Sequence, residues 1–272
     1  KIHSLSIIFR TNTNIEIWDQ NKKRIFEKPK IEYALRCLNS LIKSIKKVKE
    51  RKSDTLIKFQ VIDDNSNDEN LKKLKDLINS NSIDCEIIHH NNSEHKEKIA
   101  AENNQETFGN LSSLLKCFEI AKREQSDLIY FVEDDYLHYD HSLVDMLDTY
   151  ERISSQHKDE IIVCPSDYPF NYMNNEKTKI LIGSQQHWRT ITKILCTFMI
   201  SKKMFRKYIN NFEKTCEKRH DPFEKYLNEI LQKEIAISPI KSLAIHLTNV
   251  NSSYGLSPFI DYKKLWDENK VK

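Results

Sequence analysis

Short apolar runs alternate with amphipathic stretches over the first 165 residues of the chain. Runs of strand length occupy residues 5–9, 56–62, 83–88, 128–132 and 160–165. Apolar residues recur at helical spacing between them, in the stretches 33–45, 71–78, 111–120 and 143–153. Such alternation predicts right-handed βαβ units and a mainly parallel sheet. The expected fold class is therefore α/β, with a central sheet flanked by helices.

The remainder of the chain mixes strand and helix signals less regularly. Strand-like runs follow at 180–182, 194–200, 235–238 and 242–246. Ser201 is predicted to cap a helix that extends to Phe212, and Asp221-Pro222 has the sequence of a helix start. The aromatic residues of the tail are expected to pack on the body; they are Tyr254, Phe259, Tyr262 and Trp266. With neither an internal repeat nor a linker, we expect one domain over residues 1–272.

Three adjacent carboxylates follow the most apolar of the predicted strands. Leu128 to Val132 reads as a strand buried on both faces, and it leads directly into Glu133, Asp134 and Asp135. Ligands of open α/β sheets bind beyond the carboxyl ends of the strands. Carboxylate oxygens suit Mg²⁺ or Mn²⁺, and a diphosphate would complete the coordination shell. The competing interpretation is a solvated acidic loop that caps the next helix.

Composition narrows the classes of function. The 272 residues include 31% charged residues whose signs nearly cancel, at +3, which does not indicate a nucleic-acid-binding protein. Only three glycines occur, which excludes a P-loop and a G-x-G-x-x-G dinucleotide turn. The six cysteines form no C-x-x-C pair, so they indicate small buried residues in a reducing, cytoplasmic compartment.

Two further absences bear on metal and membrane binding. No run reaches the roughly 20 apolar residues that a transmembrane helix needs. His89, His90 and His95 lack the spacing of a metal site, so a solvated loop is expected there.

Three segments, in order, resemble those of a known family. They are the strand Leu5 to Phe9 with its polar loop, Val61 to Asp68 beside the pattern V-D-D-x-S-x-D, and Phe131 to Asp135 beside F-L-D-x-D-D, the D-x-D motif. Over about residues 4–250 the chain resembles glycosyltransferases of the GT-A fold, nearest to family 2. The resemblance implies a nucleotide-binding half at 1–138, an acceptor-binding half at 139–250 and a C-terminal tail at 251–272.

The resemblance also implies roles for individual residues. Arg10, Thr11 and either Asp63 or Asp64 would contact the base and ribose. Asp135 would bind Mn²⁺ or Mg²⁺, and Glu133 or Asp134 would bind the sugar or ribose of the donor. Glu133 replaces the family's aspartate at the first position of the motif.

Two later residues are candidates for the same site. His246 ends an apolar strand and is either a further metal ligand or a structural histidine. Arg189 either grips the diphosphate or, with Trp188, lines the acceptor site, although a core position is the simpler interpretation of Trp188.

The chemistry of sugar transfer requires two further elements. A divalent cation stabilises the leaving diphosphate, and, if the configuration inverts, one base takes the proton of the acceptor hydroxyl. Asp221 matches the place of the family's acidic base, with Glu224 as second candidate, but Asp221 equally suits an ordinary helix cap. The predicted activity is thus a metal-dependent, hexosyltransferase-like glycosyltransferase that acts on a glycan or another hydroxyl acceptor.

Two other functions stay open at this point. A sugar-phosphate nucleotidyltransferase would use a related sheet, but residues 10–20 lack the glycine-rich loop that usually holds the triphosphate. A non-catalytic domain that binds glycans or a protein would use the aromatic loop Tyr168 to Tyr172.

Overall fold

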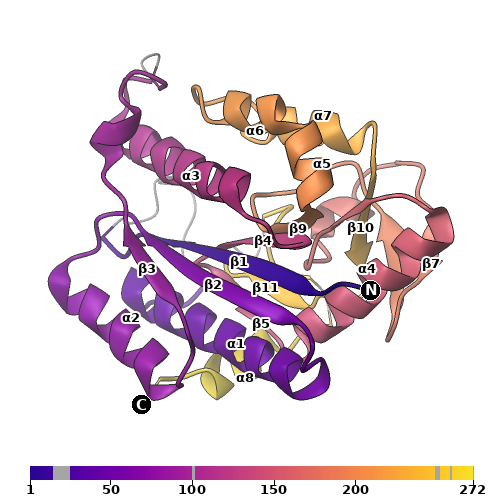
Figure 1. Cartoon of the computed structure of the whole chain (residues 1–272), viewed down its shortest axis with the longest axis horizontal. Helices are drawn as coiled ribbons and strands as arrows, with labels where there is room; N and C mark the ends of the chain where they lie inside the picture. The colour runs from indigo at the N-terminus through magenta and orange to yellow at the C-terminus, as the bar shows by residue number, and fades with distance from the viewer. Residues whose placement is uncertain (15–24, 100–101, 249–251, 258, 272) are drawn as a thin grey trace.

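The computed structural model describes residues 1–14, 25–99, 102–248, 252–257 and 259–271 (Figure 1). Most of the glycine-free loop after the first strand, residues 15–24, lies outside them. In the described residues a nine-stranded sheet has the order β3-β2-β1-β4-β9-β6-β10-β8-β7. Its first four strands are parallel; they are β1 (Ser4–Thr11), β2 (Leu56–Asp63), β3 (Glu86–His89) and β4 (Leu128–Glu133).

Antiparallel pairing enters the sheet in its second half. β9 (Phe198–Ser201) lies between β4 and β6 (Ile161–Val163) and is antiparallel to both. β6 pairs in parallel with β10 (Ile235–Pro239), which pairs antiparallel with β8 (His187–Thr190). The edge strand is β7 (Ile180–Ile182). A separate two-stranded sheet joins β5 (Tyr136–His138) to β11 (Ala244–His246).

Helices cover both faces of the large sheet (Figure 1). One face carries α1 (Lys30–Arg51), α2 (Asp68–Ser80), α4 (Ser142–His157) and the short α8 (Tyr262–Glu268). The other carries α3 (Gln105–Arg123), α5 (Lys202–Lys207), α6 (Ile209–Thr215) and α7 (Lys225–Leu231). Two single turns complete the described elements, η1 (Asn92–His95) and η2 (Pro169–Tyr172). The expected α/β class, a central sheet flanked by helices, is confirmed.

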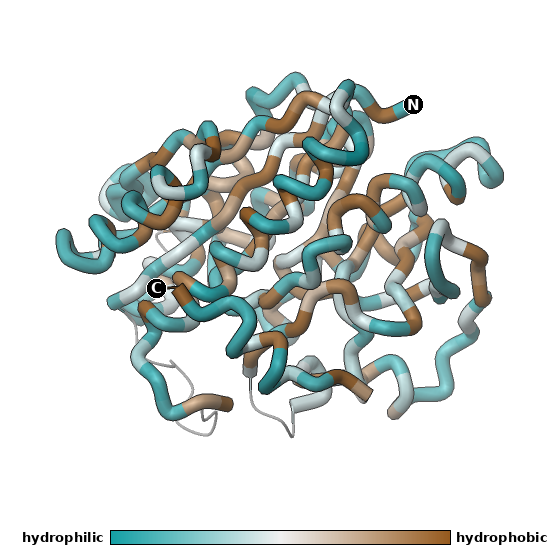
Figure 2. Tube along the Cα trace, turned by 90° about the horizontal axis from the view of Figure 1, so that it is seen from below, coloured by the Kyte–Doolittle hydropathy of each residue, from teal (hydrophilic) through white to brown (hydrophobic). Residues whose placement is uncertain are grey.

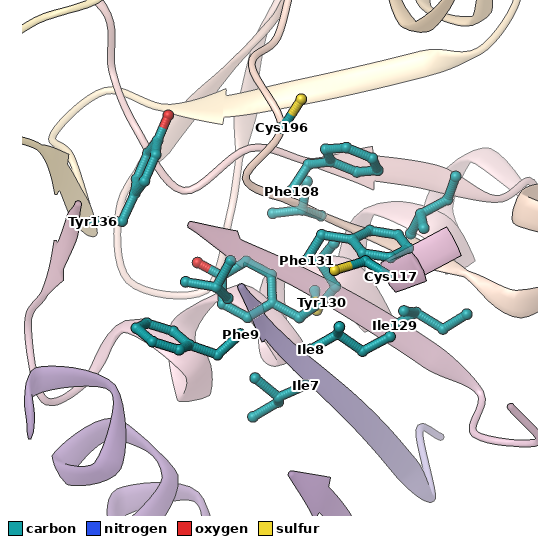
Figure 3. Packing of buried hydrophobic residues seen from close by; sticks show 14 of the residues in the cluster. Ile7, Ile8, Phe9, Cys117, Ile129, Tyr130, Phe131, Tyr136, Cys196 and Phe198 are labelled. Carbon is teal, nitrogen blue, oxygen red and sulfur yellow. The ribbon is translucent and has the colours of Figure 1, made fainter. Parts of the chain in front are cut away.

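The core lies between these layers, where the apolar runs predicted it. Figure 3 shows Ile7, Ile8 and Phe9 of β1 beside Ile129, Tyr130 and Phe131 of β4. Brown apolar positions fill the interior and teal polar positions line the outer turns (Figure 2). Each such buried side chain contributes roughly 1.5–3 kcal/mol relative to an exposed one, so burial on both faces stabilises β1 and β4 at the centre of the sheet. No helix in the described part of the chain is long and apolar enough to cross a membrane.

Strand register decides which polar residues meet. Arg10 stands opposite Glu133 in the β1–β4 pair, and Thr11 stands opposite Asp63 in the β1–β2 pair. In the small sheet, His246 stands opposite Tyr136. The carboxyl ends of β1, β2 and β4 therefore open at one edge of the sheet, as parallel strands require.

Several boundaries differ from the sequence prediction. Ser201 caps α5, through its Oγ and the backbone N–H of Met204, but the predicted helix is interrupted at Tyr208 and continues as α6. Asp221-Pro222 forms a turn and does not start a helix, because α7 begins only at Lys225. Trp188 is fully buried, as expected, but lies in a strand that the sequence did not indicate.

The structure corrects the expectation for the three histidines at the end of β3 and after it. His89 is exposed, but His90 and His95 are buried, so the expected solvated loop is wrong for two of the three. The Nε2 of His90 lies 2.8 Å from the Ser112 hydroxyl, and the Nδ1 of His95 lies 2.9 Å from it. Both rings therefore fasten the segment after β3 to α3.

The tail packs on the body only in part. Trp266 is buried; its ring stacks on Phe26 at 4.3 Å between centroids, and the guanidinium of Arg36 lies over it at 4.3 Å. Phe259 is 98% exposed, contrary to the expectation that it packs on the body. Tyr254 is half-buried beside Phe170, and the ring of Tyr262 contacts Phe26.

Candidate active site

A cavity of about 730 Å³ opens at the carboxyl ends of β1 and β4. Its walls come from distant parts of the chain: the strand ends, the first turns of α1 and α3, the segment before α7, and β11 with the residues after it. The size suits a small organic ligand, because such pockets typically span roughly 300–1,000 Å³. The acidic residues 133–135 all lie in its wall.

Glu133 is neutralised by the protein itself. Nη2 of Arg10 lies 2.5 Å from Oε1 of Glu133. The other terminal nitrogen of Arg10 donates to the backbone oxygen of Asn110 at 3.0 Å and to the hydroxyl of Ser113 at 3.2 Å. These charge-assisted bonds tie the end of β1 to the end of β4 and to α3.

Asp134 is also held on both oxygens. Its Oδ1 lies 2.5 Å from the ammonium of Lys30, the first residue of α1. Its Oδ2 accepts from the hydroxyl of Thr11 at 2.8 Å and from the backbone N–H of Asn12 at 3.2 Å. Burial alone would lower the pKa of Lys30, but the charges of Asp134 and Asp135 outweigh it and raise that pKa. Asp134 therefore anchors the loop after β1 rather than offering an open ligand position.

Asp135 differs from Asp134 because only one of its two carboxylate oxygens has a partner among the described residues. Its Oδ2 lies 3.3 Å from Nε2 of His246, while its Oδ1 is buried with no hydrogen-bond partner among the described residues. Burial alone would raise the pKa of Asp135, but the charge of His246 outweighs burial and holds that pKa below its usual range. A buried carboxylate oxygen without a partner is costly, so this position favours a cation.

The orientation of His246 fits the same position. Its Nδ1 lies 2.8 Å from the backbone oxygen of Tyr254, which can only accept, so Nδ1 carries the proton. Nε2 consequently faces Asp135, with the lone pair that a metal ion requires whenever the ring is neutral. Burial alone would lower the pKa of His246, but the Asp135 charge outweighs it and raises that pKa.

The donor set is one carboxylate and one imidazole. Across the described residues, no group of three or more His, Cys, Asp and Glu side chains could hold a metal ion. Two protein ligands fit Mg²⁺ or Mn²⁺, which take their remaining ligands from water and phosphate oxygens. The residues present thus fit a cation that arrives with a diphosphate.

Of Asp63, which ends β2, and Asp64, which follows it, only Asp64 lines the cavity. Asn12 donates to it at 3.3 Å and Asn65 donates to it at 3.0 Å; Asn65 adopts the left-handed conformation, with φ 57°. Burial raises the pKa of Asp64. As far as the described residues form the walls, Asp63 is not among them, and its Oδ2 lies 3.6 Å from Nδ1 of His89.

Asp221 and Glu224 also lie in the cavity wall and come from the turn before α7. Asp221 is exposed and Glu224 is half-buried. Because α7 begins at Lys225 and Glu224 occupies its N-cap position, Asp221 does not cap that helix. The ordinary structural interpretation of Asp221 therefore does not apply.

Arg189 lies away from this group. It is not one of the described residues that line the cavity, and its Nη2 donates to the hydroxyl of Tyr172 at 2.6 Å and lies 3.6 Å from Oδ1 of Asp167. Tyr172 covers the guanidinium, with its ring centroid 4.2 Å away. The contacts of Arg189 thus belong to the aromatic loop.

Several residues that line the cavity had no role in the sequence analysis, among them Lys30, Asn110, Ser113 and Tyr254. Lys30 is one lysine among many, and only the fold brings it to Asp134. Asn110 and Ser113 gave the clearest signal that was missed, because two polar residues three apart share a face of the helix that also carries the apolar stripe. Tyr254 contributes a backbone oxygen, which no sequence pattern marks.

Comparison with known proteins gives similarity of structure alone. No family model matches the chain, and no curated protein matches it. TarS 1–349 of S. aureus is 14% identical, with a TM-score of 0.49, over 89% of this chain and 59% of that one. The chain thus spans less than two thirds of that structure.

Two further solved structures are similar at the same level. The galactosyltransferase LgtC, in complex with donor and acceptor sugar analogs, is 13% identical with a TM-score of 0.41, over 83% of this chain and 70% of that one. UDP-glucose pyrophosphorylase complexed with UDP-glucose is 10% identical with a TM-score of 0.41, over 89% and 92%. At these values the similarity identifies no activity, which has to be argued from the residues of the cavity.

Proposed function

We propose that the chain is a glycosyltransferase that moves a sugar from a nucleoside diphosphate sugar to a hydroxyl acceptor, such as a glycan, with Mn²⁺ or Mg²⁺ held by Asp135 and His246. The observation that carries the proposal is the pairing of these two residues in the cavity wall, with Nε2 facing Oδ2 at 3.3 Å and Oδ1 buried without a described partner. Pairing a carboxylate with a neutral imidazole nitrogen suits a divalent ion that also binds phosphate.

The donor nucleotide is proposed to lie between β2 and the acidic strand end. Asp64 and Asn12 present a carboxylate and an amide that suit the base and ribose. Lys30 lies next to Asp134 and Asp135 and brings an ammonium group with further N–H donors to the diphosphate. Arg10, Thr11, Glu133 and Asp134 hold this wall in shape through the contacts described above.

The leaving diphosphate accumulates negative charge as the bond to the sugar breaks. A bound divalent cation would supply charge neutralisation at those oxygens. Lys30 contributes a second positive charge on the same side. The Asp135 carboxylate and the oriented imidazole of His246 would hold that cation.

The acceptor hydroxyl must lose a proton during transfer, and we assign this to the turn before α7. Glu224 and Asp221 are both in the cavity wall. We place Glu224 ahead of Asp221 because partial burial favours a basic carboxylate over an exposed one. A single base opposite the donor corresponds to inversion of configuration.

Calorimetry with UDP and GDP, with and without Mn²⁺, tests the proposal. We expect one nucleoside diphosphate to bind only when Mn²⁺ is present. Asp135→Ala should abolish Mn²⁺-dependent binding while the protein stays folded, as measured by circular dichroism. Asp140→Asn is a matched control, because Asp140 is exposed and contacts only its neighbour His141 among the described residues. Binding without Mn²⁺, or no binding of either nucleotide, contradicts the proposal.

Analysis of the products separates transfer from nucleotide activation. Incubation with a nucleoside diphosphate sugar and a hydroxyl acceptor should release the nucleoside diphosphate. Release of pyrophosphate from a nucleoside triphosphate and a sugar phosphate would instead identify a nucleotidyltransferase. Glycan binding without nucleotide binding would identify a non-catalytic domain.

A further inference from the structure

The imidazole of His246 is held on three sides. Its Nε2 faces Asp135, its Nδ1 donates to the backbone oxygen of Tyr254 at 2.8 Å, and its ring lies parallel to that of Tyr136. The two ring centroids are 4.7 Å apart, with 9° between the planes. A ring stacked on one face and hydrogen-bonded at Nδ1 can neither flip nor tilt without breaking a contact.

Burial and a contact with Tyr168 fix the position of Tyr136. Its side chain is fully buried, and its hydroxyl lies 2.6 Å from the hydroxyl of Tyr168, which is also buried. Figure 3 shows Tyr136 standing apart from the side chains of β1 and β4 that form the sheet core. Tyr136 is thus part of the same buried cluster but lies at its side, on β5, which pairs with β11 where His246 stands.

Tyr254 is fixed by the aromatic loop. The ring of Phe170 stacks on that of Tyr254, with centroids 5.2 Å apart and 7° between the planes, and the ring of Tyr168 meets it edge-on at 5.4 Å. The backbone N–H of Phe170 also donates to the oxygen of Ser253 at 2.7 Å. The loop at 168–172 thus positions the peptide whose oxygen accepts from His246.

We propose that Tyr136, Tyr168, Phe170 and Tyr254, here called the aromatic cluster, are positioning residues that set the ring orientation of His246 and aim its Nε2 at the cation position beside Asp135. The cation itself rests on the proposed function, but the orientation of the ring does not. Partners that orient a ligating histidine typically change metal affinity by about 10–100-fold when they are removed.

The cluster also joins two parts of the molecule. Phe170 lies in the loop on the proposed acceptor side, and Tyr254 lines the cavity. Displacement of the loop would shift the Tyr254 oxygen and loosen His246. If the aromatic cluster were only structural, its disruption would lower the stability of the fold but leave the hydrogen bond from Nδ1 of His246 intact.

The test measures the Nδ1–H of His246 by NMR, because this hydrogen is present in both the charged ring and the expected neutral tautomer. In the metal-free wild-type chain we expect a resonance that exchanges slowly with water. Phe170→Ala should speed that exchange at least tenfold and weaken Mn²⁺ binding, measured by electron paramagnetic resonance, by about tenfold. Phe170→Tyr, which keeps the stacked ring, should restore both.

Two further variants sharpen the comparison. Tyr136→Leu removes the ring beside His246 and should weaken Mn²⁺ binding, whereas Tyr136→Phe keeps the ring and should have a smaller effect. Phe259→Ala is the control, because it removes an aromatic ring from the same tail at a position that is 98% exposed. Unchanged exchange and unchanged Mn²⁺ affinity in folded Phe170→Ala would overturn the proposal. A wild-type chain that binds no Mn²⁺ even with UDP or GDP present would contradict the proposed function, and the exchange comparison would then still support or overturn the positioning role.

Discussion

Arg10 and Glu133 stand opposite one another in the register of β1 and β4, and their charged groups meet at 2.5 Å at the edge of the cavity. The pair joins two neighbouring strands close to their carboxyl ends. The first acid of the D-x-D-like segment is thus bonded to the β1 residue that the resemblance assigned to the nucleotide. Both side chains therefore stabilise the wall of the cavity without a bound ligand.

Removing one partner of this pair should destabilise the chain. Arg10→Gln leaves Glu133 without its charged partner in a mostly buried position, and we expect a loss of roughly 3 kcal/mol in the free energy of unfolding. Urea denaturation measures it. The double variant Arg10→Gln with Glu133→Gln should recover part of the loss, because no lone charge remains. An equal or larger loss in the double variant would show that the pair contributes little.

Loss of the cap of α2 should have a smaller and local effect on stability. Oδ1 of Asn67 accepts from the backbone N–H of Asn70 at 2.8 Å. Asn67→Ala should therefore lower stability by about 1 kcal/mol, and Asn67→Ser, which can cap, should lose less. Thermal denaturation followed by circular dichroism measures both. Equal losses in the two variants would assign the effect to the side-chain amide of Asn67, which donates to Oδ1 of Asn14 at 3.2 Å.

The buried histidine His90 should make stability depend on pH. Burial lowers the pKa of His90 to about 4, below its ordinary value of 6.5. The unfolded chain therefore binds a proton at higher pH than the folded chain does. The stabilising effect of the neutral ring is complete above about pH 6.5 and is lost as the pH falls towards 4.

The variant His90→Gln tests this dependence, because its amide can still donate to Ser112 without titrating. The stability difference between wild type and variant should shrink from pH 7 to pH 5, by at most about 1.4 kcal/mol for each pH unit. Urea denaturation at the two pH values measures it. A difference that stays constant would show that His90 does not titrate differently on folding.

Substitutions of the two candidate bases should lower kcat to different extents. Glu224→Gln should reduce kcat for sugar transfer by a factor of about 10² or more while nucleotide binding is retained. Asp221→Asn should have a smaller effect, because Asp221 is exposed. Transfer rates measured with Mn²⁺ and a nucleoside diphosphate sugar compare them. The opposite order would identify Asp221 as the base.

The sequence predicted those parts of the fold that local patterns control. The apolar run at 128–132 and its acidic end became β4 and part of the cavity, because a strand buried on both faces leaves few other places for three carboxylates. Ser201 was predicted to cap a helix, and it caps α5. These features depend on neighbours within a few residues.

Features that depend on contacts between distant residues were not predictable. Nothing near Lys30 in the sequence indicates that it reaches Asp134, which lies 104 residues later. β8 was missed because three of the four residues from His187 to Thr190 are polar, and the segment becomes a strand by pairing with its neighbours in the sheet, such as β10. His90 and His95 looked like loop residues, since the Ser112 hydroxyl that they share belongs to a helix.

The placement of β9 has a consequence for dividing the chain. This strand comes late in the sequence, yet it pairs with β4 along Leu128 to Phe131 and covers the edge of the most apolar strand of the first half. A fragment of residues 1–138 would therefore expose a long hydrophobic edge with unpaired backbone groups. Such edges recruit other chains, so the isolated fragment should self-associate instead of folding as a separate nucleotide-binding unit.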